Sequence, residues 1–221
     1  MLNFDYMAGL LPVLLGYVPL TMGMATLSMA LALVLASLLA IVRVLRLPIL
    51  DPITRVFISF FRGTPLLVQL FLFYYGLPQL FSALTAIDGV TAAIAGLTLH
   101  FSAYMAESIR AAIIGVDRSQ WDAAKSIGMT MRQMLRRIIL PQAARVAAPT
   151  LVNYFIDIIK STSLAFTLGV TELMGSAQKE AASSFLYFEA FILVACIYWA
   201  IVEALSYVQA ALERYLHRAY S

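Results

Sequence analysis

Charged side chains are scarce in this chain of 221 residues, where only 12% of positions are Asp, Glu, Lys or Arg and 62% are apolar. A soluble domain carries about 25% charged residues. The shortage therefore excludes an ordinary soluble domain and indicates an all-α integral membrane protein. The single cysteine, Cys196, excludes an intrachain disulfide, and its apolar neighbours favour a packing role for it.

Sequence signatures of catalysis and nucleotide binding are also missing. The chain contains no Gly-x-x-x-x-Gly-Lys-Ser/Thr loop of the kind that binds nucleotide phosphates. The two histidines, His100 and His217, are far apart, and one cysteine does not complete a metal site with them. No nucleophile stands at a recognisable spacing from a base. We therefore expect no enzyme activity, no catalytic residue, no bound metal or cofactor and no nucleic-acid partner.

Five long apolar stretches predict five transmembrane helices, because a helix needs about 20 residues to cross the hydrocarbon core. The N-terminal residues lack the basic segment of a cleaved signal, so the first stretch should remain in the protein. Pro12 and Pro19 place the start of its regular helix near Leu20 or Thr21, after an interfacial segment of residues 1–20. The other spans are expected at 63–87, at 90–114, from Pro149 onward and at 185–212, with an amphipathic interfacial elbow at 50–62.

The basic residues predict the orientation of these spans. Of the 15 Lys and Arg residues, only Lys160 and Lys179 lie outside three regions: the segment after the first span, the loop before the fourth, and the C-terminus. Cytoplasmic segments carry the excess of basic residues. Five spans then leave the N-terminus outside and a tail of residues 213–221 in the cytoplasm.

The loop of residues 115–147 predicts a helix–turn–helix on the cytoplasmic side, with its first helix at about 120–127. An acidic residue opens the first turn, where it suits the positive end of the helix dipole. Two alanines then give the helix a small surface that suits close approach to another protein. A glycine breaks the helix, and an amphipathic segment leads to a proline. These residues are Asp122, Ala123, Ala124, Gly128 and Pro141.

Several ionisable groups fall inside the expected spans, where a charge is expensive and indicates function by default. Asp157 and Lys160 are three residues apart, which fits either a local salt bridge or a functional pair. Glu107 and Arg110 have the same spacing and are predicted to pair and to hold the base of the loop. His100 needs a polar partner in the bilayer, and this partner is either another residue of the packed protein or a bound ligand.

The spacing in the loop resembles the EAA loop of type I ATP-binding-cassette importer permeases. In this sequence three residues separate Ala124 from Gly128, and nine separate Gly128 from Ile138. Asp122 stands where the family has Glu, which keeps the charge on a shorter side chain. Further stretches resemble the polar amino-acid branch of that family: 61–69, 102–110 and 140–143.

The resemblance covers residues 21–212 and implies a five-helix permease domain in a bacterial cytoplasmic (inner) membrane. It implies a second permease subunit, identical or paralogous, and two cytoplasmic ATPase subunits that carry the ATP and magnesium. It also implies an extracytoplasmic solute-binding protein that delivers the substrate. The residues implied to couple to the ATPase are Asp122, Ala123, Ala124, Gly128, Ile138, Leu140 and Pro141.

The same resemblance implies a polar amino-acid substrate and a pocket lined by His100 and Tyr104. Ser161, the residue after Lys160, takes a position that is often acidic in similar permeases. Gln69 is a further candidate for a polar lining residue. An opine or another small zwitterion is the alternative substrate class.

Two other classes of function compete with transport of an amino acid. One is a membrane receptor or scaffold that keeps the ATPase dock without transport, although polar residues within the spans favour a solute path. The other is an ion channel, but the chain has no filter-like run of glycines.

Overall fold

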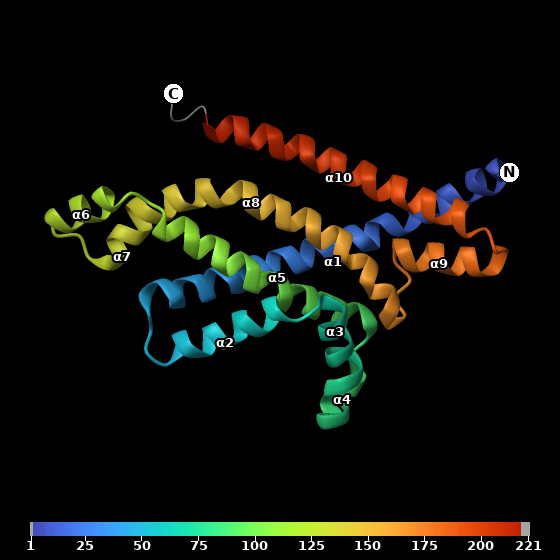
Figure 1. Ribbon diagram of the computed structural model, residues 1–221, viewed down its shortest axis with the longest axis horizontal. Coiled ribbons are helices and arrows are strands. Elements are labelled where there is room, and N and C mark those ends of the chain that lie inside the picture. The colour runs from blue at the N-terminus through green and yellow to red at the C-terminus, as the bar shows by residue number, and fades with distance from the viewer. Residues whose placement is uncertain (1, 218–221) are drawn as a thin grey trace.

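The computed structural model describes residues 2–217, which form helices joined by short connections with no strand among them. Met1 and residues 218–221, the end of the expected cytoplasmic tail with Arg218, lie outside the described residues. The long helices are α1 (Phe4–Leu45), α5 (Gly89–Ile114), α8 (Leu140–Ser161) and α10 (Tyr187–His217) (Figure 1). In the described part, α1, α5 and α10 are each long and apolar enough to cross a membrane.

Helix α1 begins about 17 residues earlier than the two prolines predicted. The Asn3 side chain caps it by accepting a hydrogen bond from the backbone N–H of Tyr6 at 3.0 Å. Pro12 and Pro19 lie inside the helix, so the predicted start near residue 20 is wrong. The physical reason is packing: Leu10 and Leu14 are buried in a cluster with residues of α9 and α10, and such contacts outweigh the hydrogen bonds that proline removes.

Helix α5 lies at the centre of the bundle and confirms the prediction for residues 90–114. Asp88 caps it, because its side chain accepts a hydrogen bond from the Thr91 N–H at 2.7 Å. Small side chains let α1 and α5 approach closely, as in other membrane helix pairs. The buried alanines at this contact and around it include Ala25, Ala32, Ala36, Ala103 and Ala106.

The expected second span is broken into short pieces. It consists of α3 (Leu66–Phe71), a π-helical turn (Leu72–Gly76), α4 (Leu77–Leu80) and a 3₁₀ turn (Ser82–Ala86). The amphipathic segment before it is helix α2 (Leu50–Gly63). The chain bends by 111° between α2 and the α3–α4 segment, and the pair together is a fourth candidate span.

The fourth predicted span begins earlier than expected. Its chain runs through α7 (Met131–Met134) and a π-helical turn (Leu135–Ile139) directly into α8, so Pro149 lies within the helix and does not open it. Pro141 stands in the first turn of α8, directly after the π-helical turn. After α8 come a 3₁₀ turn (Thr162–Leu168) and α9 (Leu173–Ser184), a helix that the sequence reasoning missed.

The elements sort to two ends of the long axis (Figure 1). Helices α6 (Arg118–Ser126) and α7 lie at one end, together with the connection from α1 to α2 and the C-terminal part of α10. The N-terminus and α9 lie toward the other end. The basic loop and the basic segment after α1 therefore share one end of the molecule.

Candidate functional site

The first candidate site is the tip formed by α6 and α7. Asp117 caps α6, because its carboxylate accepts a hydrogen bond from the Ser119 N–H at 2.8 Å. This backbone hydrogen bond holds the pKa of the Asp117 carboxyl below its ordinary value. The helix thus begins before Asp122, and the prediction that Asp122 opens the first turn is wrong. Asp122 instead lies on the exposed side of α6, with its carboxylate 4.0 Å from Lys125 Nζ.

Gly128 ends α6 with a left-handed backbone, at a φ of +75°. The Gly128 N–H donates to the Lys125 carbonyl at 2.9 Å, and the Met129 N–H donates to the Ala124 carbonyl at 3.1 Å. These bonds satisfy the last carbonyls of the helix. A Cβ at Gly128 would meet nothing within 4 Å, so the backbone angle, and not space, favours glycine here.

The structure divides the seven predicted coupling residues into two groups. Asp122, Ala123 and Gly128 are exposed at the tip, and Pro141 is exposed at the start of α8. The other three face inward: Ala124 is buried, and Ile138 and Leu140 pack against the cluster under the loop.

Two exposed apolar residues at the tip were missed by the sequence reasoning. Ile127 is 76% exposed and Met131 is 46% exposed, and they flank Gly128 in the chain. Large apolar side chains on either side of an exposed turn glycine were the signal that could have found them, because exposed apolar groups of this size mark contact surfaces when they gather.

The second candidate site is a cavity of about 530 Å³ between α5 and α8. Three of the four predicted substrate residues line it: His100 and Tyr104 from α5, and Ser161 from the end of α8. The lining that the sequence reasoning did not assign to a pocket is Phe101, Tyr154, Asp157, Lys160 and Leu164.

Gln69, the fourth predicted residue, lies behind the cavity wall. Its side chain is buried, and its amide nitrogen donates to the carbonyls of Phe61 at 3.0 Å and Thr64 at 3.1 Å. The amide oxygen is 3.0 Å from His100 Nδ1. Because that oxygen can only accept, Nδ1 carries the hydrogen, and in the neutral ring Nε2 is left as the acceptor. Gln69 thus sets the tautomer of His100.

The ring of Tyr104 is held from two sides. Its hydroxyl donates to the Arg62 carbonyl at 3.3 Å, and the guanidinium carbon of Arg62 lies 5.4 Å from the ring centroid. The His100 ring centroid is 5.0 Å away. Helix α2 therefore fixes one wall of the cavity through Arg62.

Asp157 and Lys160 form an ion pair of 2.7 Å along the cavity edge. A local salt bridge was one of the two alternatives that the sequence left open, and the structure shows it. The two side chains keep 48% and 55% of their exposure, so both charged groups remain open to a solute. A carboxylate and an ammonium group side by side complement a zwitterion.

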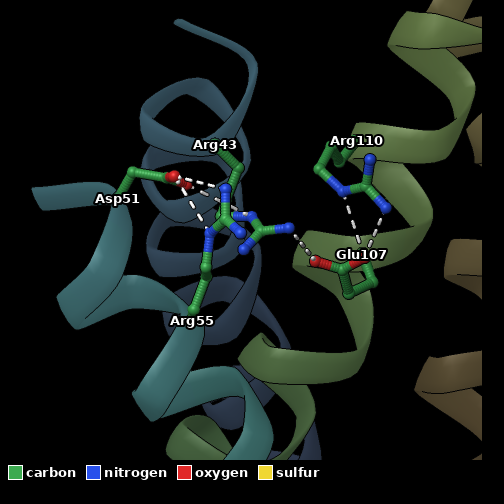
Figure 2. A network of polar contacts seen from close by, with 5 residues as sticks. All are labelled: Arg43, Asp51, Arg55, Glu107 and Arg110. Atoms are coloured by element: carbon green, nitrogen blue, oxygen red, sulfur yellow. Dashed lines mark hydrogen bonds and ion pairs between the residues drawn. The ribbon is translucent and has the colours of Figure 1, made fainter. Parts of the chain in front are cut away.

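A network of charges connects three helices near the loop (Figure 2). Arg110 pairs with Glu107 at 2.7 Å, as predicted. The guanidinium of Arg43, from α1, lies 3.9 Å from Glu107 and 3.6 Å from Asp51 of α2. Arg55 then pairs with Asp51 at 2.7 Å. The network ties the end of α1 to α2 and to the end of α5.

Two relatives align with almost the whole chain. A probable amino-acid ABC transporter permease protein of Vibrio harveyi is 62% identical over 218 residues, covering 99% of this chain and 98% of its own length. A probable amino-acid permease protein of Bacillus subtilis is 43% identical, with the same two coverages. These relatives are permease subunits, the non-catalytic membrane components of their transporters.

A solved structure agrees in fold. A chain in the crystal structure of an amino acid ABC transporter with histidines is 31% identical, with a TM-score of 0.89 over 97% of this chain and 99% of that chain. The sequence also matches a family described as binding-protein-dependent transport system inner membrane component over residues 32–218. This chain therefore belongs to that family, as a multi-pass membrane permease of the amino-acid ABC transporter kind.

Proposed function

We propose that this chain is the permease subunit of an ATP-binding-cassette importer and forms the translocation path for a polar amino acid. The observation that carries the proposal is the α5–α8 cavity, because residues predicted from separate parts of the sequence, His100, Tyr104 and Ser161, line it together. The names of the two relatives and of the solved structure, all amino-acid permeases or transporters, support the substrate class.

The cavity suits a small zwitterion in size and in charge. Its volume of about 530 Å³ lies within the range of small-molecule pockets, roughly 300–1,000 Å³. In this proposal Lys160 binds a carboxylate of the solute and Asp157 its ammonium group, and the exposure of both charged groups at the cavity edge supports it. His100 Nε2 accepts a hydrogen bond from a polar side chain of the solute, because Gln69 occupies Nδ1.

The α6–α7 tip is proposed to dock into an ATPase subunit. The exposed surface for this contact combines Asp122 and Ala123 with the apolar side chains of Ile127 and Met131. Ile138 and Leu140 anchor the loop 115–147 to the bundle beneath it. Movement of the docked tip on ATP binding then rocks the permease between inward-open and outward-open states.

The proposed topology has five spans in a transmembrane domain of residues 21–212: α1, the bent α2–α4 segment, α5, α8 and α10. The N-terminus faces outside, where residues 4–20 extend α1, and the C-terminus is cytoplasmic. The end of the bundle that holds the α6–α7 tip also holds the basic segment after α1, which supports this orientation (Figure 1). The membrane is the bacterial inner membrane.

The complete importer is proposed to contain a second permease subunit, identical or paralogous, two ATPase subunits and an extracytoplasmic binding protein. The ATP and magnesium belong to the ATPase subunits. The family description, a component of a binding-protein-dependent system, supports this set of partners.

The ATPase activity of the reconstituted complex tests the proposal. The complex, with its binding protein, is assayed with each amino acid in turn. Stimulation by one polar amino acid supports the proposal and names the substrate. A flat response from an intact complex overturns the amino-acid assignment, and opines and other zwitterions are then assayed in the same way; if these fail too, the chain is a scaffold for its ATPase.

A further inference from the structure

A second cavity, of about 480 Å³, lies in the same groove between α5 and α8, toward the loop. Its walls are mostly small or uncharged, and it contains no ion pair like that of Asp157 and Lys160. The lining is Ser108, Ala111, Ala112, Gly115, Val116, Asp117, Gln142, Val146, Ala147 and Thr150.

The two cavities follow one another along a single helix pair. On α5, Tyr104 of the first cavity is followed by Ser108 and Ala111 of the second at helical spacing. On α8, which runs the other way, Tyr154 of the first is followed by Thr150 and Val146 of the second. The cavities are thus consecutive chambers of one groove.

One hydrogen bond crosses the groove between the chambers. Ser108 Oγ of α5 and Tyr154 Oη of α8 are 2.9 Å apart. Ser108 lines the second chamber and Tyr154 lines the first. The ring centroid of Tyr154 also lies 6.4 Å from that of Tyr104 and 6.5 Å from that of Phe101, so this bond stands beside three clustered aromatic rings of the first chamber.

One wall residue of the second chamber is also part of the start of helix α6. Asp117 lines that chamber and is also the residue that caps α6 through the Ser119 N–H. Gln142, on the opposite wall, is held by its amide donating to the Ile138 carbonyl at 2.9 Å. A displacement of α6 therefore moves part of the chamber wall directly.

We propose that the second cavity is a release chamber for the same zwitterionic solute and that the Ser108–Tyr154 hydrogen bond is the gate between the two chambers. The proposal rests on the proposed transport function. The solute binds beside the charged pair in the first chamber, passes when the bond opens, and leaves from the second chamber because that chamber lacks the Asp157–Lys160 pair. Tyr154 and Ser108 are positioning residues for this step.

Thiol accessibility from the ATPase side tests the gate. In a Cys196→Ser background, Ser161→Cys reports on the first chamber and Thr150→Cys on the second. The whole complex is placed in everted membrane vesicles and treated with a membrane-impermeant sulfonated maleimide. We expect Thr150→Cys to react and Ser161→Cys to be protected while the gate is intact.

Opening the gate should expose the first chamber. A hydrogen bond of this kind shifts a two-state equilibrium by about 2- to 12-fold, so Tyr154→Phe or Ser108→Ala should raise the labelling rate of Ser161→Cys by that factor. Tyr6→Phe is the matched control, because Tyr6 and Ser184 form a similar hydroxyl pair of 3.0 Å between α1 and the end of α9.

The outcomes separate the gate from the transport function. Unchanged labelling in both gate variants, or an equal rise in Tyr6→Phe, overturns the gate. Amino-acid stimulation of ATPase activity is measured separately, on the complex without any substitution. If stimulation is present and the gate variants do not change the labelling rate, the transport function is supported and the proposed gate is rejected. If stimulation by every amino acid is absent, the amino-acid assignment in the proposed function is overturned.

Discussion

Gly128 has a backbone conformation that most residues adopt at a cost of about 1–2 kcal/mol. Gly128→Val should therefore let the tip relax into another shape, and docking must recover that energy. We expect association with the ATPase to weaken by about 5- to 30-fold, measured as the dissociation constant of the purified permease and ATPase. Gly63→Val is the control, because Gly63 has no positive φ and open space for a Cβ. Equal binding by the two variants would contradict the role of the turn.

Glu172 is a buried carboxylate that joins three helices. It accepts hydrogen bonds from Thr21 of α1 at 3.2 Å, Tyr198 of α10 at 3.1 Å and the Gly175 N–H of α9 at 2.9 Å. Glu172→Ala leaves these donors unpaired, at about 1–3 kcal/mol for each buried group. We expect a clear drop in the melting temperature of the detergent-purified protein. Glu180→Ala, on the same helix but less buried, should change it little; an equal drop would refute the assigned role.

Among the elements, the first turns of α1 are integral to the bundle. Leu14 is fully buried, whereas its neighbour Leu15 is 49% exposed. Leu14→Ala should lower the free energy of unfolding by about 2–5 kcal/mol, and Leu15→Ala should lower it far less. Chemical unfolding of the two variants measures the difference. Equal effects would mean that residues 4–20 do not pack on the bundle.

Helix α5 was predictable because its sequence has no Asp, Glu, Lys or Arg before Glu107 and because Asp88 provides a local cap. The start of α1 could not be predicted from the local sequence, because a proline there indicates the end of a helix. The contacts that keep this segment helical join Leu10 and Leu14 to the distant helices α9 and α10. Helix α9 was missed for a similar reason: it is short, and its buried face depends on Leu173, Ala177 and Ala181 meeting distant partners.

In the candidate site, the family resemblance implied that His100 and Tyr104 line the pocket, and their spacing of four residues adds only that they share one helix face. The role of Gln69 could not be predicted, because its partner His100 is 31 residues away on another helix. The Ser108–Tyr154 hydrogen bond could not be predicted for the same reason, because the two residues are 46 positions apart and lie on different helices. Local patterns predict which residues share a face, and packing decides which faces meet.

For the whole molecule, three proposed spans precede the loop 115–147, and this odd number places the N-terminal end of α1 and the loop on opposite sides of the membrane. In a Cys196→Ser background, Asn3→Cys should react with an impermeant maleimide from outside intact cells. Ser126→Cys, at the end of α6, should react only in everted vesicles. Labelling of both from the same side would contradict the five-span topology.

The length of α1 has a mechanical consequence. Its 42 residues make a rod of about 63 Å, roughly twice the thickness of the hydrocarbon core. At one end, the Asn3 N–H donates to Glu189 of α10, and at the other, Arg43 reaches Asp51 and Glu107. Because contacts with other helices hold both ends of this rod, a tilt of α1 at one end of the bundle is accompanied by movement at the other end.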